Sequence, residues 1–562
     1  MNILTNPTCI LLLSSIILYF IPTRLFRTSA LICAIYTIIT SLIFISKLNH
    51  PIIFNLIGFK LVLSYISPLT PIFLLAFAFV FLLNLVFSFG SQKLNKNEII
   101  AAFIYAGSAV SIITAGDLIS IFFSMELMSI SATIIIFSSK SNNSYLAAKR
   151  YFCIHLTAGL IFLIGTIIYI KQNGNANIIP FQPISSFNNH NLAGILVLSG
   201  ILINAGSLPF SSWIADSYPE ASNYGSCFLS VFTTKTSVFL LLTYFPGNII
   251  LIYLGIAMIF YGIIYAILEN NIRRILSYSL VNQVGFMVLA AGMGTELAIK
   301  GAALHAFCHI FYKTLLFMSA GAVIYSTNQH KCTELGGLFA SMRYTSLCAI
   351  IGAASISGFP LTSGFISKSI IVEVAYHYNI FIWWALIIAS SGVFLHAGLE
   401  FPWFTFFQRK PKRNVPKTPM MMKIAMGCTA FICIYLGIDY NIIYNLLPNQ
   451  VSYHPYTLSH ISEQSQLLLS SALTFFLLIP LLKRENTISL DIDFFYRKLP
   501  IHISYLLNQC TKLIVDYSTN FYQILNKSNN RIVYIIKYEH ILSLTVCTTI
   551  FVLICFIIFS IV

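Results

Sequence analysis

Charged residues are what this sequence has least of. Only 9% of its 562 residues are Asp, Glu, Lys or Arg, and 57% are hydrophobic. A soluble domain usually carries about 25% charged residues. The composition therefore excludes an ordinary soluble protein. It predicts an all-α, polytopic protein of the membrane.

The chain also lacks the patterns that bind cofactors. Its 12 Cys are scattered, mostly inside apolar runs, without a CxxC pair, which argues against iron–sulfur, zinc and disulfide frameworks. No Rossmann-type glycine pattern offers a site for NADH or flavin. We expect no cofactor and no metal. The N-terminus has no charged leader and no small-residue cleavage site, so its first apolar run is expected to be a retained helix.

Apolar runs long enough to cross a bilayer, which takes roughly 20 residues, predict about 14 to 16 transmembrane helices. The interrupted apolar stretch 51–67 is a candidate for the membrane interface. The runs begin near residues 8, 28, 68, 97, 117, 148, 192, 222, 248, 273, 298, 343, 379, 421, 466 and 541.

The net charge of +15 is distributed unevenly over the predicted connections. Most Lys and Arg fall on the side opposite the N-terminus, which predicts that this side is cytoplasmic and the N-terminus outside. The basic cluster 409–417 is better explained as an anchor near anionic lipid than as a nucleic-acid site. We therefore expect contacts with the lipid bilayer and with other membrane subunits, and none with nucleic acid. Residues 483–540 are a basic, aromatic segment expected to lie along the cytoplasmic interface or on a neighbouring subunit.

One predicted span, residues 300–325, carries His305, His309 and Lys313 at intervals of four. Side chains four apart lie on one helix face. A charge at the bilayer centre costs at least about 2.5–3.5 kcal/mol. The stripe should therefore face other helices or water between them. We favour a proton relay over polar residues that only fix helix packing.

Three more ionisable residues, Glu126, Lys235 and Lys368, also fall inside predicted spans. Two spans are interrupted by Gly and Pro, at 204–209 and at 357–364. Such a pair predicts inverted repeats around an ion site at mid-membrane depth. Backbone groups freed at the breaks need water or protein partners, which predicts a hydrated cavity beside them.

These features predict six segments. They are N-terminal helices (1–96), a first five-helix repeat (97–245), a second five-helix repeat (246–405), C-terminal helices (406–482), the basic segment (483–540) and a final helix (541–562).

Five stretches resemble the proton-translocating antiporter-like subunits shared by Mrp-type multisubunit cation/proton antiporters and respiratory complex I. They are FFSMELMSISA around Glu126, LPFSSWIADSYPEAS around Trp213, RRILSYSLVNQVGFM from Arg273, LHAFCHIFYKTLLFMSAG around His305 and SGFPLTSGFISKS ending near Lys368. SYPEAS…FLSVFTTKT and SLDIDFFYRK look most similar to the D-like Mrp subunits.

The resemblance implies that protons pass along a hydrated row of side chains at mid-membrane depth. It assigns this row to Glu126, Lys235, His305, His309, Lys313 and Lys368. In one respect the chain departs from the family, because the lysine usual on the first broken helix is replaced by Asn204. Asparagine cannot carry a proton or neutralise Glu126, so either Glu126 stays protonated or another cation serves it. The nearest cations in sequence are Lys149 and Arg150.

Three functions remain open on the sequence. The first is a subunit of an Mrp-type Na⁺/H⁺ antiporter in a bacterial inner membrane, with an organellar inner membrane as the less favoured location. The second is a non-redox, proton-pumping subunit of an NADH:quinone oxidoreductase. The third is a structural membrane scaffold with impaired transport.

Overall fold

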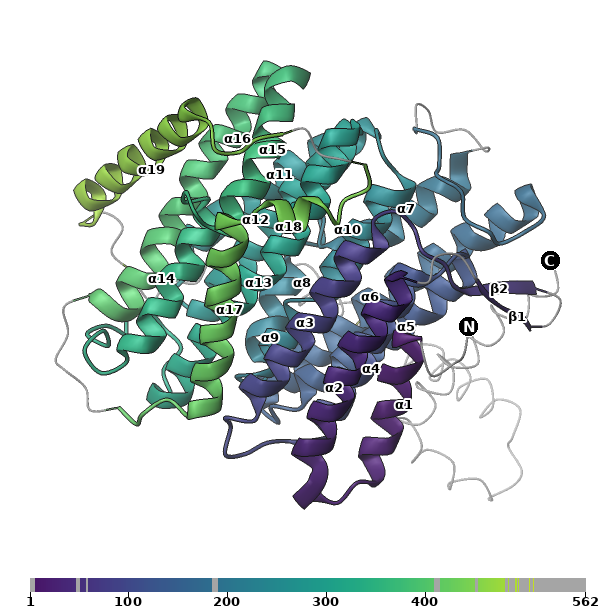
Figure 1. Ribbon diagram of the computed structural model, residues 1–562, viewed down its shortest axis with the longest axis horizontal. Helices are drawn as coiled ribbons and strands as arrows, with labels where there is room; N and C mark the ends of the chain where they lie inside the picture. The colour runs from purple at the N-terminus through teal and green to yellow at the C-terminus, as the bar shows by residue number, and fades with distance from the viewer. Residues whose placement is uncertain are drawn as a thin grey trace, which may run out of the picture. The chain divides into compact units, whose positions relative to one another are not determined.

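The computed structural model describes residues 6–46, 51–56, 59–183, 191–408, 415–449 and 453–480, together with residues 484, 491, 492, 494, 505 and 509. The chain divides into two units, 1–489 and 490–562. The described part of the first unit is a bundle of helices with one short β-hairpin (Figure 1). The final predicted span, from 541, and nearly all of the basic segment 483–540 lie outside the described residues.

The N-terminal part contains two helices, the hairpin and a third helix. These elements are α1 (Pro7–Phe20), α2 (Thr23–Ser46), β1 (Ile52–Leu56), β2 (Phe59–Ser64) and α3 (Thr70–Ser88).

The hairpin occupies the stretch 51–67, for which the sequence suggested only an interfacial location. The amide of Val62 donates to the Asp117 carboxylate at 2.6 Å, and the amide of Gly116 donates to the Val62 carbonyl at 2.9 Å. Asp117 also accepts a hydrogen bond from the amide of Ser120, as the N-cap of the helix that follows. Residues distant in sequence thus satisfy the backbone of this non-helical segment.

Two series of helices follow along the chain. The first consists of α4 (Lys96–Thr114), α5 (Leu118–Phe137), α6 (Asn142–Asn173), α7 (Leu192–Ala205), α8 (Ser212–Ser217), α9 (Gly225–Leu229) and α10 (Thr233–Tyr244). The second consists of α11 (Ile249–Leu268), α12 (Ile272–Met293), α13 (Glu296–Thr327), α14 (Arg343–Ser357), α15 (Ser363–Tyr378) and α16 (Ile380–Val393), which continues into the π-helical turns η4 (Phe394–Glu400) and η5 (Trp403–Phe407).

The third helix of each series, α6 or α13, is 32 residues long and is followed by a broken helix. The first half of each broken helix ends at a glycine in the left-handed conformation, Gly206 with φ 74° and Gly358 with φ 73°. Only glycine adopts this conformation without strain, so these residues end α7 and α14 at the two predicted breaks. The boundaries of the two predicted repeats, 97–245 and 246–405, stay predictions.

The C-terminal part comprises α17 (Met420–Ile438), α18 (Asn441–Tyr444) and α19 (Leu458–Leu478). Every predicted span up to the one from residue 466 falls on described helices, and the spans from 192, 222 and 343 are each divided between two or more of them. Within the described ranges, eleven helices are long and apolar enough to cross a membrane. The fold class predicted from the sequence is thus confirmed, with the hairpin as its one departure from all-α structure among these residues.

Helices α12 and α13 are buried along their apolar stretches. Helix α13 packs against α3, α10, α12, α14, α15 and α17 (Figure 1). Outer helices instead expose large apolar side chains, among them Ile32, Tyr253 and Phe431. Apolar surface of this kind faces lipid in a membrane protein, so the polar stripe of α13 is kept away from lipid by the helices around it.

A buried row of ionisable side chains

His305, His309 and Lys313 lie on α13 and are buried, with no more than 1% of each residue exposed. The ring centroids of His305 and His309 are 6.3 Å apart. Every residue of α13 from Lys300 to Ile324 is buried, so other parts of the protein surround this stretch of the helix. The predicted stripe is therefore a continuous polar line inside protein.

His305 is held by side chains from two other helices. Its Nε2 lies 3.2 Å from the Gln283 amide oxygen on α12, and its Nδ1 lies 3.0 Å from the Ser367 hydroxyl on α15. The Tyr312 hydroxyl donates to the same Gln283 oxygen at 3.1 Å. Ser367 is the residue before Lys368, so His305 connects the stripe to the second broken helix.

His309 and Lys313 are held much less tightly. Neither ring nitrogen of His309, nor the ammonium of Lys313, has a hydrogen-bond partner among the described residues. The Lys313 ammonium lies 5.9 Å from the ring centre of Phe317. Buried polar atoms are almost always satisfied by protein or by ordered water. Within the described part of the protein, these three atoms therefore lack the partner that buried polar atoms usually have.

Lys235 lies at a discontinuity that sequence reasoning did not find. The span 225–244 is interrupted between α9 and α10, and the Lys235 ammonium donates to the freed carbonyl of Ser230 at 2.6 Å and to the Thr234 hydroxyl at 3.1 Å. Helix α10 packs against α13. Lys235 is therefore carried by a helix that adjoins the helix of the stripe.

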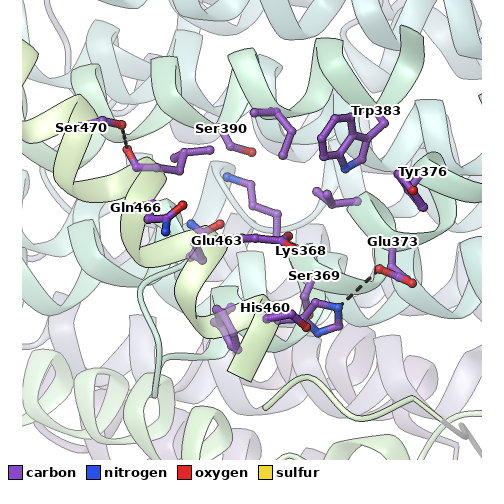
Figure 2. A pocket seen from close by; sticks show the side chains of 17 residues that line it. Lys368, Ser369, Glu373, Tyr376, Trp383, Ser390, His460, Glu463, Gln466 and Ser470 are labelled. Carbon is purple, nitrogen blue, oxygen red and sulfur yellow. Dashed lines mark hydrogen bonds and ion pairs between the residues drawn. The ribbon is translucent and has the colours of Figure 1, made fainter. Parts of the chain in front are cut away.

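Lys368 extends into a cavity of about 820 Å³ between α15, α16 and α19 (Figure 2). Its ammonium lies 5.0 Å from the ring centre of Phe286 and 3.5 Å from the Ile356 carbonyl, at the break between α14 and α15. The Gln464 amide of α19 donates to the neighbouring Ser357 carbonyl at 3.1 Å. A cavity therefore lies beside this break; that it is hydrated, as expected for freed backbone groups, stays a prediction.

Glu373 lies at the far end of this cavity, between two imidazoles. The Nε2 atoms of His377 and His460 lie 3.1 and 3.4 Å from its two carboxylate oxygens. Figure 2 shows the contact with His460, whose other ring nitrogen lies 3.3 Å from the Tyr453 hydroxyl. The side chain of Glu373 is 34% exposed and that of His377 is 70% exposed. This end of the cavity therefore lies at the surface of the chain.

Neither cation that the sequence offered for Glu126 pairs with it among the described residues. Glu126, on α5, is half-buried and has no ion pair among the described residues. Arg150, considered as its substitute cation, instead forms a bidentate pair with Asp216, at 2.6 and 2.8 Å. Lys149 is exposed. The Glu126 carboxylate lies against Gly159 of α6, where an added Cβ would come within 1.7 Å of its Oε1.

Sequence reasoning missed several buried ionisable residues. His155 contacts Asn204, whereas His396 and Glu400 lie on the π-helical turn η4. Glu400 pairs with Arg484 at 2.5 Å. Each of the three lies inside an apolar run, the same signal by which the sequence pointed to Lys235. In addition, His396 and Glu400 are four residues apart, the spacing that places two side chains on one helix face. Within the described ranges, no group of three His, Cys, Asp or Glu residues is arranged to hold a metal ion.

The part of the chain that contains this row matches a known protein family. Residues 115–395 match the family described as "NADH:quinone oxidoreductase/Mrp antiporter, TM". These residues include all six members of the row predicted from the sequence. They also include both broken helices.

Curated relatives come from several kinds of complex. Hydrogenase-4 component B of Escherichia coli is 26% identical over 47% of this chain and 43% of its own length. A subunit of the Na⁺/H⁺ antiporter of Alkalihalophilus pseudofirmus is 28% identical over 49% of this chain and 58% of its own length. A subunit of the NADH-quinone oxidoreductase of Desulforudis audaxviator is 28% identical over 58% of this chain and 69% of its own length. The chain thus spans about half the length of the first two relatives.

A solved structure shares the fold. A chain in the structure of the Mrp complex from Dietzia sp. DQ12-45-1b superposes with a TM-score of 0.71, at 16% identity, over 85% of this chain and 100% of that one. At this identity the likeness concerns the fold alone.

Proposed function

The chain belongs to the NADH:quinone oxidoreductase/Mrp antiporter transmembrane family, and we propose that it moves protons through a multisubunit Mrp-type cation/proton antiporter. The observation that carries the proposal is the buried row from Lys235 through Lys313, His309 and His305 to Lys368. Among the described residues these buried lysines form no ion pair with a carboxylate, and such lysines are costly to retain for packing alone.

The proposed transport needs no covalent chemistry. A buried lysine accepts a proton while the neighbouring basic side chain is neutral. It releases the proton when that neighbour becomes positively charged again. The two histidines accept at one ring nitrogen and donate from the other, which suits transfer along a helix face. The hydrogen bond between His305 and Ser367 brings the row to Lys368. Lys368 faces the cavity that ends at Glu373, through which protons would exchange with water on that side.

We propose the Mrp-type complex, with Na⁺ as counter-ion, because of the resemblance around residues 217–236 and at 489–498 and because of the Na⁺/H⁺ antiporter protein among the relatives. Under this proposal the chain lies in a bacterial inner membrane with its N-terminus outside and its basic connections in the cytoplasm. The end of the cavity at Glu373 then opens to the outside.

A second candidate is a non-redox subunit of an NADH:quinone oxidoreductase, favoured by the relative from Desulforudis audaxviator. Mass spectrometry of the intact complex from native membranes distinguishes the two. Small antiporter subunits that co-purify would support the Mrp-type complex, whereas flavin- and iron–sulfur-bearing partners would support the redox-driven one.

Proton flux through the purified complex in liposomes, followed with a pH-sensitive dye, tests transport itself. Lys235→Ala and Lys368→Ala should each lower the flux more than tenfold, while Lys149→Ala, on the exposed side of α6, should leave it unchanged. Normal flux in either buried-lysine variant of an assembled complex would contradict the proposal and favour a structural scaffold.

A further inference from the structure

A buried histidine lies beside the position where the first broken helix lacks its lysine. His155 of α6 is 3% exposed, and its Nδ1 hydrogen-bonds the side-chain oxygen of Asn204 on α7. Its ring is 4.0 Å from the ring of Tyr151 and 4.5 Å from that of Trp213, centre to centre. The Trp213 indole is itself fixed, donating to the Ile203 carbonyl at 3.0 Å.

The hydrogen bonds of Asn204 decide which nitrogen of His155 can accept a proton. The Asn204 amide nitrogen donates to the Gly200 carbonyl at 3.2 Å, so the amide oxygen faces the imidazole. An amide oxygen only accepts, so Nδ1 of His155 carries the hydrogen. The lone pair of the neutral ring is therefore on Nε2, which has no hydrogen-bond partner among the described residues. Nε2 is thus, within the described ranges, the ring nitrogen with a free lone pair.

Glu126 lies on one side of His155. The Glu126 carboxylate touches the α6 backbone at Gly159. Gly159 is one helical turn after His155 and on the same face. The acid and the imidazole thus occupy adjacent turns of one helix surface.

Hydroxyl groups lie on the other side, toward Lys235. The Tyr151 hydroxyl is 3.4 Å from the Thr233 hydroxyl, which is 2.6 Å from the Tyr105 hydroxyl. Thr233 begins α10, two residues before Lys235. Each hydroxyl both donates and accepts, so the group can pass a proton onward.

We propose that His155 carries the proton between Glu126 and Lys235, in place of the lysine that the family resemblance expects at Asn204. In this arrangement Asn204 is a positioning residue that fixes the tautomer of His155. The inference rests on the proposed function and adds a proton-carrying residue to its first half.

The test uses the intact complex in liposomes. His155→Gln keeps a side chain that can hydrogen-bond Asn204 but cannot carry a proton, and it should lower proton flux at least tenfold. Adding Asn204→Lys to that variant should restore flux to within about threefold of the wild type, which a purely structural histidine would not allow. Thr157→Ala, on the exposed face of α6, is the matched control. If the Gln variant does not assemble, the smaller His155→Asn answers the same question.

The outcomes separate the two proposals. If Lys235→Ala abolishes flux while His155→Gln transports normally, His155 is not a carrier and this inference is overturned. Loss in His155→Gln without restoration by Asn204→Lys also overturns it, because the histidine is then structural. Normal flux in Lys235→Ala would instead overturn the proposed function itself.

Discussion

His305 on α13 and Ser367 on α15 are joined by a hydrogen bond of 3.0 Å between the imidazole Nδ1 and the hydroxyl. The two residues belong to different helices, and Ser367 directly precedes Lys368 on the helix after the second break. This bond joins the stripe of α13 to the helix that carries Lys368, the lysine that faces the cavity. Its removal tests the connection without altering any charge.

Ser367→Ala should slow proton flux about fivefold, because a typical hydrogen bond is worth roughly 1 kcal/mol and its loss frees His305 to rotate. Ser367→Thr keeps the hydroxyl and serves as the control, with flux close to that of the wild type. Flux is measured in liposomes at equal amounts of assembled complex. Equal flux in the Ala and Thr variants would show that proton transport does not depend on the hydrogen bond between His305 and Ser367.

Gly159→Ala should impair transport more than stability. The new methyl group would meet the flexible end of Glu126, which can move away, so the midpoint of thermal unfolding should change little. Flux should fall several-fold because the carboxylate is displaced from the surface of α6. Gly165→Ala is the contrasting variant, since its methyl group would lie 2.8 Å from the Val197 backbone nitrogen and must distort α7. A Gly165→Ala protein as stable as the wild type would show that the nearest neighbour of the added methyl group, backbone or flexible side chain, does not decide its effect on stability.

The ion pair between Glu400 and Arg484 should matter for stability. Its side chains are 0% and 5% exposed and 2.5 Å apart. Glu400→Ala leaves a buried guanidinium without its carboxylate and should cost about 3–5 kcal/mol. Thermal unfolding in detergent measures the loss. Glu373→Ala, which breaks only partly exposed pairs, should cost less than about 1 kcal/mol. Similar losses in both variants would argue against a buried pair at Glu400.

The cavity beside Lys368 should be open to water on one side of the membrane. A cysteine introduced at Ser459, which lines its outer end on α19, should react with a membrane-impermeant thiol reagent added from outside intact cells. Leu473→Cys, on the exposed apolar side of the same helix, should not react because it faces lipid. The two labelling rates, compared with the unmodified chain, check both hydration and orientation. Labelling at Ser459 from the cytoplasmic side alone would reverse the proposed topology.

Much of the fold could be read from the sequence because its signals are local. Residues of one apolar run are helical, so the predicted spans up to the one from residue 466 fall on described helices. Gly206 and Gly358 ended their helices as predicted, since left-handed backbone is a property of glycine itself. The hairpin at 52–64 was not predicted, because its strands are fixed by Asp117 and Gly116, which lie far along the chain.

By itself, the sequence determined that Glu126, Lys235 and Lys368 lie inside spans. It also determined that His305, His309 and Lys313 share a helix face. That follows from helical periodicity and from the cost of charge in lipid. Tertiary structure alone decided the partners: Arg150 pairs with Asp216 and not with Glu126, and His155 meets Asn204. Which side chains meet depends on how α5, α6, α7 and α8 pack. Packing joins residues distant in sequence, and no spacing within one helix encodes it.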